Sequence, residues 1–162
     1  MRKILLSALA VASMLSVANA KILQSGGWDS IEAVIDSKVK LEHEHKIPSM
    51  VDEITKLIAV EKDDSRTLHY SYDILEKKFL EMLSKERGEK ITQLPAVFYP
   101  VFAQKTAEKI TSDVCNSKPD RALLEIGGRY RYTYYKDAED GKHPLIVDFT
   151  IEKSDCEDLE KK

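Results

Sequence analysis

The sequence is short of the residues that mark several large classes of protein. Its 162 residues include two cysteines, five prolines and six glycines, too few for a disulfide-dense scaffold or a linker rich in proline and glycine. The formal net charge is −3, so the basic face of a dedicated nucleic-acid-binding protein is not expected. Apart from one run near the N-terminus, which is discussed below, no apolar stretch is long enough to cross a membrane.

Recognisable catalytic motifs are also missing. The sequence contains neither G-x-S-x-G nor H-E-x-x-H. The Gly127-Gly128 pair lacks the Lys-Ser/Thr of a phosphate-binding loop and precedes a predicted strand. The histidines show no spacing typical of a catalytic triad; they are His43, His45, His69 and His143. We therefore expect a protein that is not an enzyme, with no catalytic residues and no cofactor.

The N-terminal residues are typical of a secretory signal peptide. Arg2 and Lys3 precede an apolar run at residues 4–17, and Ala18-Asn19-Ala20 follows with the small-x-small pattern of a cleavage site. The run is shorter than the roughly 20 residues that span a bilayer, which argues against a membrane anchor. No cysteine lies at the cleavage site to accept a lipid. We expect cleavage after Ala20 and a periplasmic or secreted protein.

The two cysteines, Cys115 and Cys156, lie in the part of the chain that would be exported. An even number of cysteines in an oxidising compartment indicates a disulfide. A metal pair or a redox motif is the competing interpretation, but there is no C-x-x-C and no histidine close to either residue in the sequence. We predict a disulfide that joins the end of a helix to the end of the last strand.

Hydrophobic periodicity predicts the fold class. Apolar residues alternate with polar ones at residues 67–74, 130–135 and 145–152, which is typical of strands, and residues 51–60 fit either a strand or a helix. A period near four residues predicts helices over 75–87 and 101–115, and Pro119 begins a short one that ends before Gly127. Asp140-Gly141 predicts a hairpin turn. The expected fold is α+β, with an antiparallel sheet of about four strands from two hairpins, helices packed on one face and one disulfide.

The same patterns divide the chain. With 43% hydrophobic and 33% charged residues, the composition is that of one ordinary globular domain. The expected parts are a signal peptide at 1–20, a partly helical N-terminal segment at 21–46, a single α+β domain at 47–156 and a frayed tail at 157–162.

Two groups of side chains are candidates for binding. His43 and His45 in the sequence EHEH would face the same side of a strand and could grip a metal, but a solvated polar segment is the favoured interpretation, so no metal site is expected. Most of the tyrosines lie in or beside predicted strands, where they either pack the sheet on its helices or form a binding face; core packing is favoured. Residues expected to point away from the core form the candidate contact surface: Tyr135, Ile146, Arg129 and Arg131.

Several short motifs between residues 47 and 156 resemble a known group of proteins. They are P-x-M-V-D-x-x-T at Pro48 to Thr55, Y-x-Y at Tyr70 and Tyr72, V-C at Val114-Cys115, L-L-x-x-G at Leu123 to Gly127, Y-x-Y at Tyr132 and Tyr134, the D-G turn, and D-C at Asp155-Cys156. Together they resemble small exported proteobacterial proteins, which include a quorum-sensing-regulated secreted factor of Pseudomonas and, more distantly, the pilotins of type II secretion. The resemblance implies an α+β fold with one disulfide and no enzymatic activity. The chain lacks the lipoprotein cysteine that pilotins generally have.

The function expected from these observations is binding rather than catalysis. The leading hypothesis is an exported protein that binds a protein partner in the bacterial envelope or outside the cell. The alternative is a periplasmic module that holds a small apolar ligand between the strand tyrosines and Phe98 or Phe102. A metal carrier or a periplasmic enzyme would need the EHEH segment to meet a third ligand such as His69.

Overall fold

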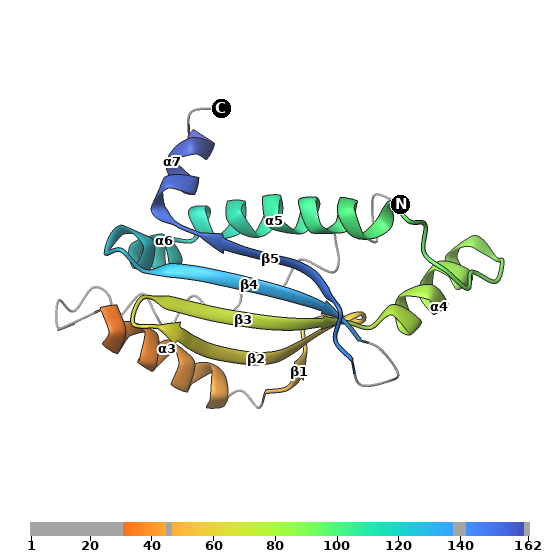
Figure 1. Ribbon diagram of the computed structural model, residues 1–162, viewed down its shortest axis with the longest axis horizontal. Coiled ribbons are helices and arrows are strands. Elements are labelled where there is room, and N and C mark those ends of the chain that lie inside the picture. Colours follow the sequence, from red (N-terminus) through yellow and green to blue (C-terminus); the bar gives the residue numbers. More distant parts are fainter. Residues whose placement is uncertain (1–30, 45–46, 138–141, 161–162) are drawn as a thin grey trace.

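The computed structural model describes residues 31–44, 47–137 and 142–160 (Figure 1). In chain order the elements are α3 (Ile31–Glu44), β1 (Ser49–Met50), β2 (Thr55–Asp64), β3 (Thr67–Ile74), α4 (Glu76–Arg87), α5 (Phe98–Asn116), α6 (Lys118–Glu125), β4 (Arg129–Lys136), β5 (Leu145–Ile151) and α7 (Lys153–Glu160). The predicted signal peptide with its cleavage after Ala20, His45 and the Asp140-Gly141 turn lie outside the described residues. Within the described ranges, no helix combines the length and the apolar character that a membrane crossing needs.

The strands form one mixed sheet in the order β1-β2-β3-β4-β5. The two predicted hairpins are confirmed, because β2 pairs with β3 and β4 pairs with β5 antiparallel. The prediction of a purely antiparallel sheet of four strands is wrong. β3 and β4 run parallel, with Tyr70 opposite Tyr132, and the two-residue strand β1 adds a fifth member. The helices α4, α5 and α6 form the long connection that a parallel pair requires, and they return the chain to the end at which β3 began.

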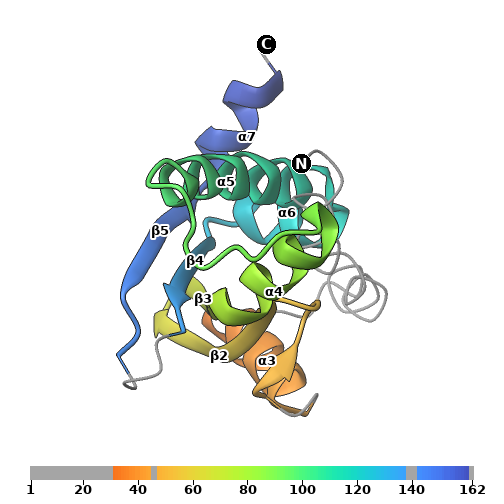
Figure 2. The ribbon, with the colours of Figure 1, turned by 90° about the vertical axis from the view of Figure 1, so that its right-hand side faces the viewer.

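Three helices cover one face of the sheet. In Figure 2 the strands form a curved layer, α3 and α5 lie on the same side of it, and α6 lies beside α5. α3 contacts β2 and β3, whereas α5 contacts β5. The side chains that they cover alternate along β3, as in Leu68, Tyr70 and Tyr72. In β2 an irregularity between Leu57 and Ala59 interrupts the alternation, so that Leu57 and Val60 are both buried. The sheet therefore has one helix-covered face and one face without a helix among the described residues.

The predicted disulfide is present between Cys115 at the end of α5 and Cys156, with a Cα–Cα distance of 5.3 Å. Cys156 lies in α7, however, and not at the end of the last strand, because the alternation of β5 ends at Ile151 and a helix begins two residues later. Residues 157–160, expected as part of a frayed tail, continue that helix. The disulfide thus joins two helices and fixes α7 against α5.

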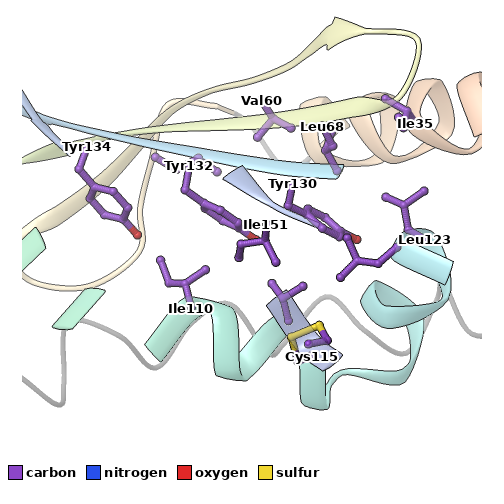
Figure 3. Packing of buried hydrophobic residues seen from close by; sticks show 14 of the residues in the cluster. Ile35, Val60, Leu68, Ile110, Cys115, Leu123, Tyr130, Tyr132, Tyr134 and Ile151 are labelled. Carbon is purple, nitrogen blue, oxygen red and sulfur yellow. A yellow bond between two sulfur atoms is a disulfide. The ribbon is translucent and has the colours of Figure 1, made fainter. Parts of the chain in front are cut away.

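The strand tyrosines form the centre of the core, as the favoured interpretation had it. Figure 3 shows Tyr130, Tyr132 and Tyr134 of β4 pointing toward α5. Tyr130 is 1% exposed, and the other two are also buried. Their neighbours on β3 stack against them, with ring centroids 5.4 Å apart for Tyr70 and Tyr132, and 4.7 Å apart for Tyr72 and Tyr134. Burial raises the pKa of all five hydroxyls above the usual value near 10.

Candidate functional site

The face of the sheet without a helix holds a network of charged side chains. Arg131 of β4 donates hydrogen bonds to Asp63 of β2 (2.7 Å) and to Asp148 of β5 (2.5 Å). The Arg131 guanidinium, by hydrogen bond and charge, holds the pKa of Asp148 below its usual range. Arg129 pairs with Asp64 at 2.7 Å and with Glu152 at 3.7 Å. Both arginines of the predicted contact surface therefore already have carboxylate partners.

A carboxylate, an imidazole and a hydroxyl form a chain of hydrogen bonds on this face. His69 Nδ1 lies 3.1 Å from Asp63 Oδ1, and His69 Nε2 lies 2.7 Å from Thr133 Oγ1. The order resembles a catalytic relay. Thr133 is 2% exposed, however, and its hydroxyl also donates to Asp148, so a substrate carbonyl has no path to the oxygen. We interpret the group as a buried polar network that links β2, β3, β4 and β5. No local sequence pattern reveals this network, because its members come from separate strands.

The other histidine prediction concerns the EHEH segment. His43 lies in the last turn of α3, and its Nε2 donates to the carbonyl of Val60 at 3.0 Å. His45 lies outside the described residues. The segment is helical up to Glu44, and residues two apart on a helix face different directions. His43 and Glu44 are therefore helical and not in the strand that this metal site would require.

Tyr135 lies in β4 beside the edge strand β5, and Ile146 lies in β5 itself. Tyr135 pairs with Leu145 in the β4–β5 register, and the register shifts between Tyr134 and Tyr135. The Tyr135 ring is half-buried and contacts the His143 ring edge-on at 6.5 Å between centroids. Ile146 is half-buried and packs partly against the core. Tyr135 and Arg131 alternate with the buried tyrosines of β4 and so share the open face, whereas Ile146 packs against the core. Arg129 lies near the other end of β4.

The outer edge of β5 is the most distinctive surface. β5 is the last strand in the sheet order, so one side of its backbone has no strand partner among the described residues. Its sequence is LIVDFTI, and Leu145 is 60% exposed. Val147 and Phe149 are partly buried, and the one charged residue, Asp148, is engaged by Arg131. The edge therefore presents backbone donors and acceptors beside apolar side chains.

The opposite edge of the sheet is protected. β1 pairs with β2 at residues 56–57, and the outer half of β2 carries Glu61, Lys62, Asp63 and Asp64. Charged side chains and short covering strands are the usual devices by which proteins prevent unwanted strand pairing. β5 has neither along most of its length. The difference between the two edges marks the β5 edge, and not the strand tyrosines, as the candidate binding surface. Only the strand order reveals this difference.

The solved structures with the same fold belong to the groups of proteins that the sequence motifs resemble. No protein-family model and no curated protein sequence matches the chain. The chain shares the fold of a Pseudomonas secreted protein and of two pilotins. For the protein of Pseudomonas aeruginosa, described as secreted, the TM-score is 0.54 at 11% identity, over 78% of this chain and 92% of that chain.

The pilotins belong to type II secretion systems. For the Vibrio vulnificus pilotin the TM-score is 0.51 at 14% identity, over 78% of this chain and 91% of that one. For the Vibrio cholerae pilotin it is 0.50 at 16% identity, over 86% and 99%. The resemblance seen in the sequence motifs is therefore confirmed at the level of the fold.

Proposed function

We propose that this chain is an exported, non-enzymatic protein that binds a protein partner in the bacterial envelope or outside the cell, through the free edge of β5. The observation that supports the proposal most directly is the exposed apolar character of this edge, which contrasts with the charged edge of β2. The N-terminal signal pattern and the disulfide fit an exported protein. The pilotins with the same fold belong to secretion systems, which supports a place in the envelope.

An extended segment of the partner is the form that suits such an edge. A strand added beside β5 would satisfy its outward N–H and C=O groups, and main-chain hydrogen bonds of this kind provide affinity in β-augmentation. Leu145 and the partly exposed flanks of Val147 and Phe149 would contact alternate side chains of the partner. Of the predicted contact residues, Tyr135 and Arg131 lie on β4 beside this edge and Ile146 lies in β5, so all three remain part of the proposed surface. Arg129 is more distant.

The alternative function, a module for a small apolar ligand, has less support. Its pocket would lie among the strand tyrosines, but Tyr134 packs against Phe102 with ring centroids 6.0 Å apart, and Tyr132 against Phe149 at 5.6 Å. The open hollows beside α4 are lined instead by residues such as Glu76, Lys77 and Lys136. No observation therefore favours the ligand-binding alternative over a protein partner.

The proposal is tested by capture from envelope extract with the disulfide-intact protein. One double variant places lysine at two exposed positions of β5, Leu145→Lys and Thr150→Lys. A control double variant places lysine at two exposed positions elsewhere, Met50→Lys on the opposite edge and Thr92→Lys in a loop. Both variants change the net charge equally, so a difference between them reports on the edge and not on charge.

We expect one stoichiometric partner that the wild-type and control proteins retain and that the β5 variant loses. Equal thermal unfolding of the two variants would show that the loss is not caused by misfolding. Retention of the partner by the β5 variant, or loss from both variants, would contradict binding through this edge. Recovery of no specific partner by the wild-type protein would count against the proposed partner-binding function itself.

A further inference from the structure

Three potential metal ligands converge where the β4–β5 connection meets the end of β3. They are Asp73, next to the last residue of β3, Asp137, which directly follows β4, and His143, which lies two residues before β5. One ligand atom from each lies within 4.8 Å of the other two. We propose that these three side chains bind a divalent transition-metal ion of the zinc type. The inference does not depend on the proposed partner-binding function.

The parallel pairing of β3 with β4 creates this cluster. Asp73 stands opposite Tyr135 and Ile74 stands opposite Lys136, so the chain leaves β4 at the level where β3 ends. The backbone N–H of Asp137 donates to the carbonyl of Ile74 at 3.1 Å, which holds the second carboxylate beside the first. The edge-on contact with Tyr135 places the His143 ring over the same point. The ligands therefore come from three positions that the backbone and the sheet hold together.

The charges of the cluster favour a cation. The Asp73 side chain is 6% exposed, and its hydrogen-bond partner is His143, whose side chain is 46% exposed. Burial of a carboxylate is unfavourable unless a positive charge or several hydrogen bonds compensate it. A neutral imidazole donates one hydrogen bond and supplies no charge, and Asp137 adds a second negative charge nearby. A bound dication would neutralise both carboxylates.

The ligand set and the spacing fit zinc better than calcium. His143 Nδ1 lies 3.0 Å from Asp73 Oδ1. Two ligand atoms about 2.0 Å from a tetrahedral zinc ion are about 3.3 Å apart, so a small movement would allow both atoms to bind the metal through lone pairs. Imidazole with carboxylates suits zinc and its neighbours, whereas calcium prefers six to eight oxygen ligands. The exposed side of His143 leaves room for water as a further ligand.

The proposed site uses His143 and not the histidines of the EHEH segment, for which a solvated segment was the favoured interpretation. The sequence pattern pointed to His43, but the Nε2 atom of that ring donates to the Val60 carbonyl. No neighbouring residue in the sequence marks His143 as a metal ligand, because Asp73 lies 70 positions away and Asp137 six. The two histidines therefore provide a matched pair for an experiment.

The test is isothermal titration of the metal-free protein, purified after expression of the full-length sequence, with Zn²⁺ and separately with Ca²⁺. The variants are His143→Gln and Asp137→Asn at exposed positions of the cluster, with His43→Gln as the control. We expect one Zn²⁺ per chain for the wild-type and His43→Gln proteins. Loss of one ligand should weaken Zn²⁺ binding at least about tenfold in either cluster variant. The NMR signals of the His143 ring should shift on Zn²⁺ addition in the wild-type protein.

Each other result would overturn the assignment. Unchanged Zn²⁺ affinity in His143→Gln would show that the metal binds elsewhere, as would loss of binding in His43→Gln. Absence of Zn²⁺ binding by the wild-type protein would show that the cluster is an ordinary ion pair. Binding of Ca²⁺ as tight as that of Zn²⁺, and unaffected by His143→Gln, would reduce the site to a nonspecific acidic patch. Thermal unfolding without metal establishes that every variant is folded.

Discussion

Lys38 of α3 donates hydrogen bonds to Asp120 of α6 at 3.1 Å and to the hydroxyl of Tyr130 at 2.9 Å, and the Lys38 side chain is only 7% exposed. The Tyr130 hydroxyl in turn donates to Asp120 at 2.7 Å. This triangle, in which Lys38 and Tyr130 are buried and the Asp120 side chain is 23% exposed, connects α3, α6 and β4. It joins the ion pairs of Lys62 with Glu32 and Asp36 in holding α3 to the rest of the domain.

Removal of either charge from this triangle should destabilise the fold strongly. We expect Lys38→Met and Asp120→Asn each to lower the free energy of unfolding by roughly 3 kcal/mol, because one buried partner is left uncompensated. The double variant Lys38→Met with Asp120→Leu should recover much of that loss, since neither charge remains. Urea unfolding followed by circular dichroism measures these values. The exposed Lys40→Met is the control, and an equal loss there would refute the explanation.

The disulfide should contribute a large part of the stability. The chain-entropy model gives about 4 kcal/mol for a loop closed over the 41-residue separation of Cys115 and Cys156. Replacement of both cysteines by alanine should lower the free energy of unfolding by about this amount. Amide hydrogen exchange should increase most in α7, which the bond fixes to α5. A loss below about 1 kcal/mol, or uniform exchange across the molecule, would contradict this role.

Two glycines are expected to respond differently to alanine. A Cβ at Gly128 would lie 2.6 Å from the Leu123 Cγ atom and 3.0 Å from its carbonyl oxygen, so the chain between α6 and β4 would have to shift. We expect Gly128→Ala to lower stability by roughly 3 kcal/mol, the upper end for overpacking. Gly88 ends α4 at φ +69° with open space around it, so Gly88→Ala should cost only about 1 kcal/mol of backbone strain. Melting curves of both variants compare them, and the reverse order would contradict the packing argument.

The buried tyrosines predict a loss of stability at alkaline pH. Burial raises the pKa values of Tyr70, Tyr130, Tyr132 and Tyr134 well above their usual value in the folded state. In the unfolded chain these phenols lose their protons above about pH 10. The free energy of unfolding is therefore unaffected by them below that pH and decreases as the pH rises above it. Urea unfolding at increasing pH should show a plateau and then a decline. The phenolate absorbance of the five stacked tyrosines, among the seven in the chain, should appear together with unfolding. Ionisation of all seven in the folded protein would contradict burial.

The elements that the sequence predicted correctly are those with strong local patterns. The alternation at Leu68, Tyr70 and Tyr72 defined β3, and the four-residue period of Phe102, Thr106 and Ile110 defined α5. Both patterns arise from the contrast between one buried and one exposed face, which neighbouring residues reveal by themselves. The disulfide was equally accessible, because two cysteines allow only one pairing.

The failures occurred where the structure depends on distant residues. β1 has two residues and is a strand only because β2 lies beside it. Cys156 was assigned to a strand end because a helix of eight residues, mostly exposed, has little apolar periodicity. Parallel pairing of β3 and β4 leaves no mark on either sequence, since each strand would show the same alternation in an antiparallel pair.

The sequence by itself therefore determined the class of this protein: its α+β composition, its two hairpins, its tyrosine core and its single disulfide. Each of these follows from residue spacing or residue count. The tertiary structure alone decided that β3 lies parallel to β4, and this placed Asp73 beside Asp137 and His143, linked His69 to Thr133, and left β5 at an open edge. These relationships join residues far apart in the chain, and their positions are set by how the helices return the chain to the sheet rather than by any local preference.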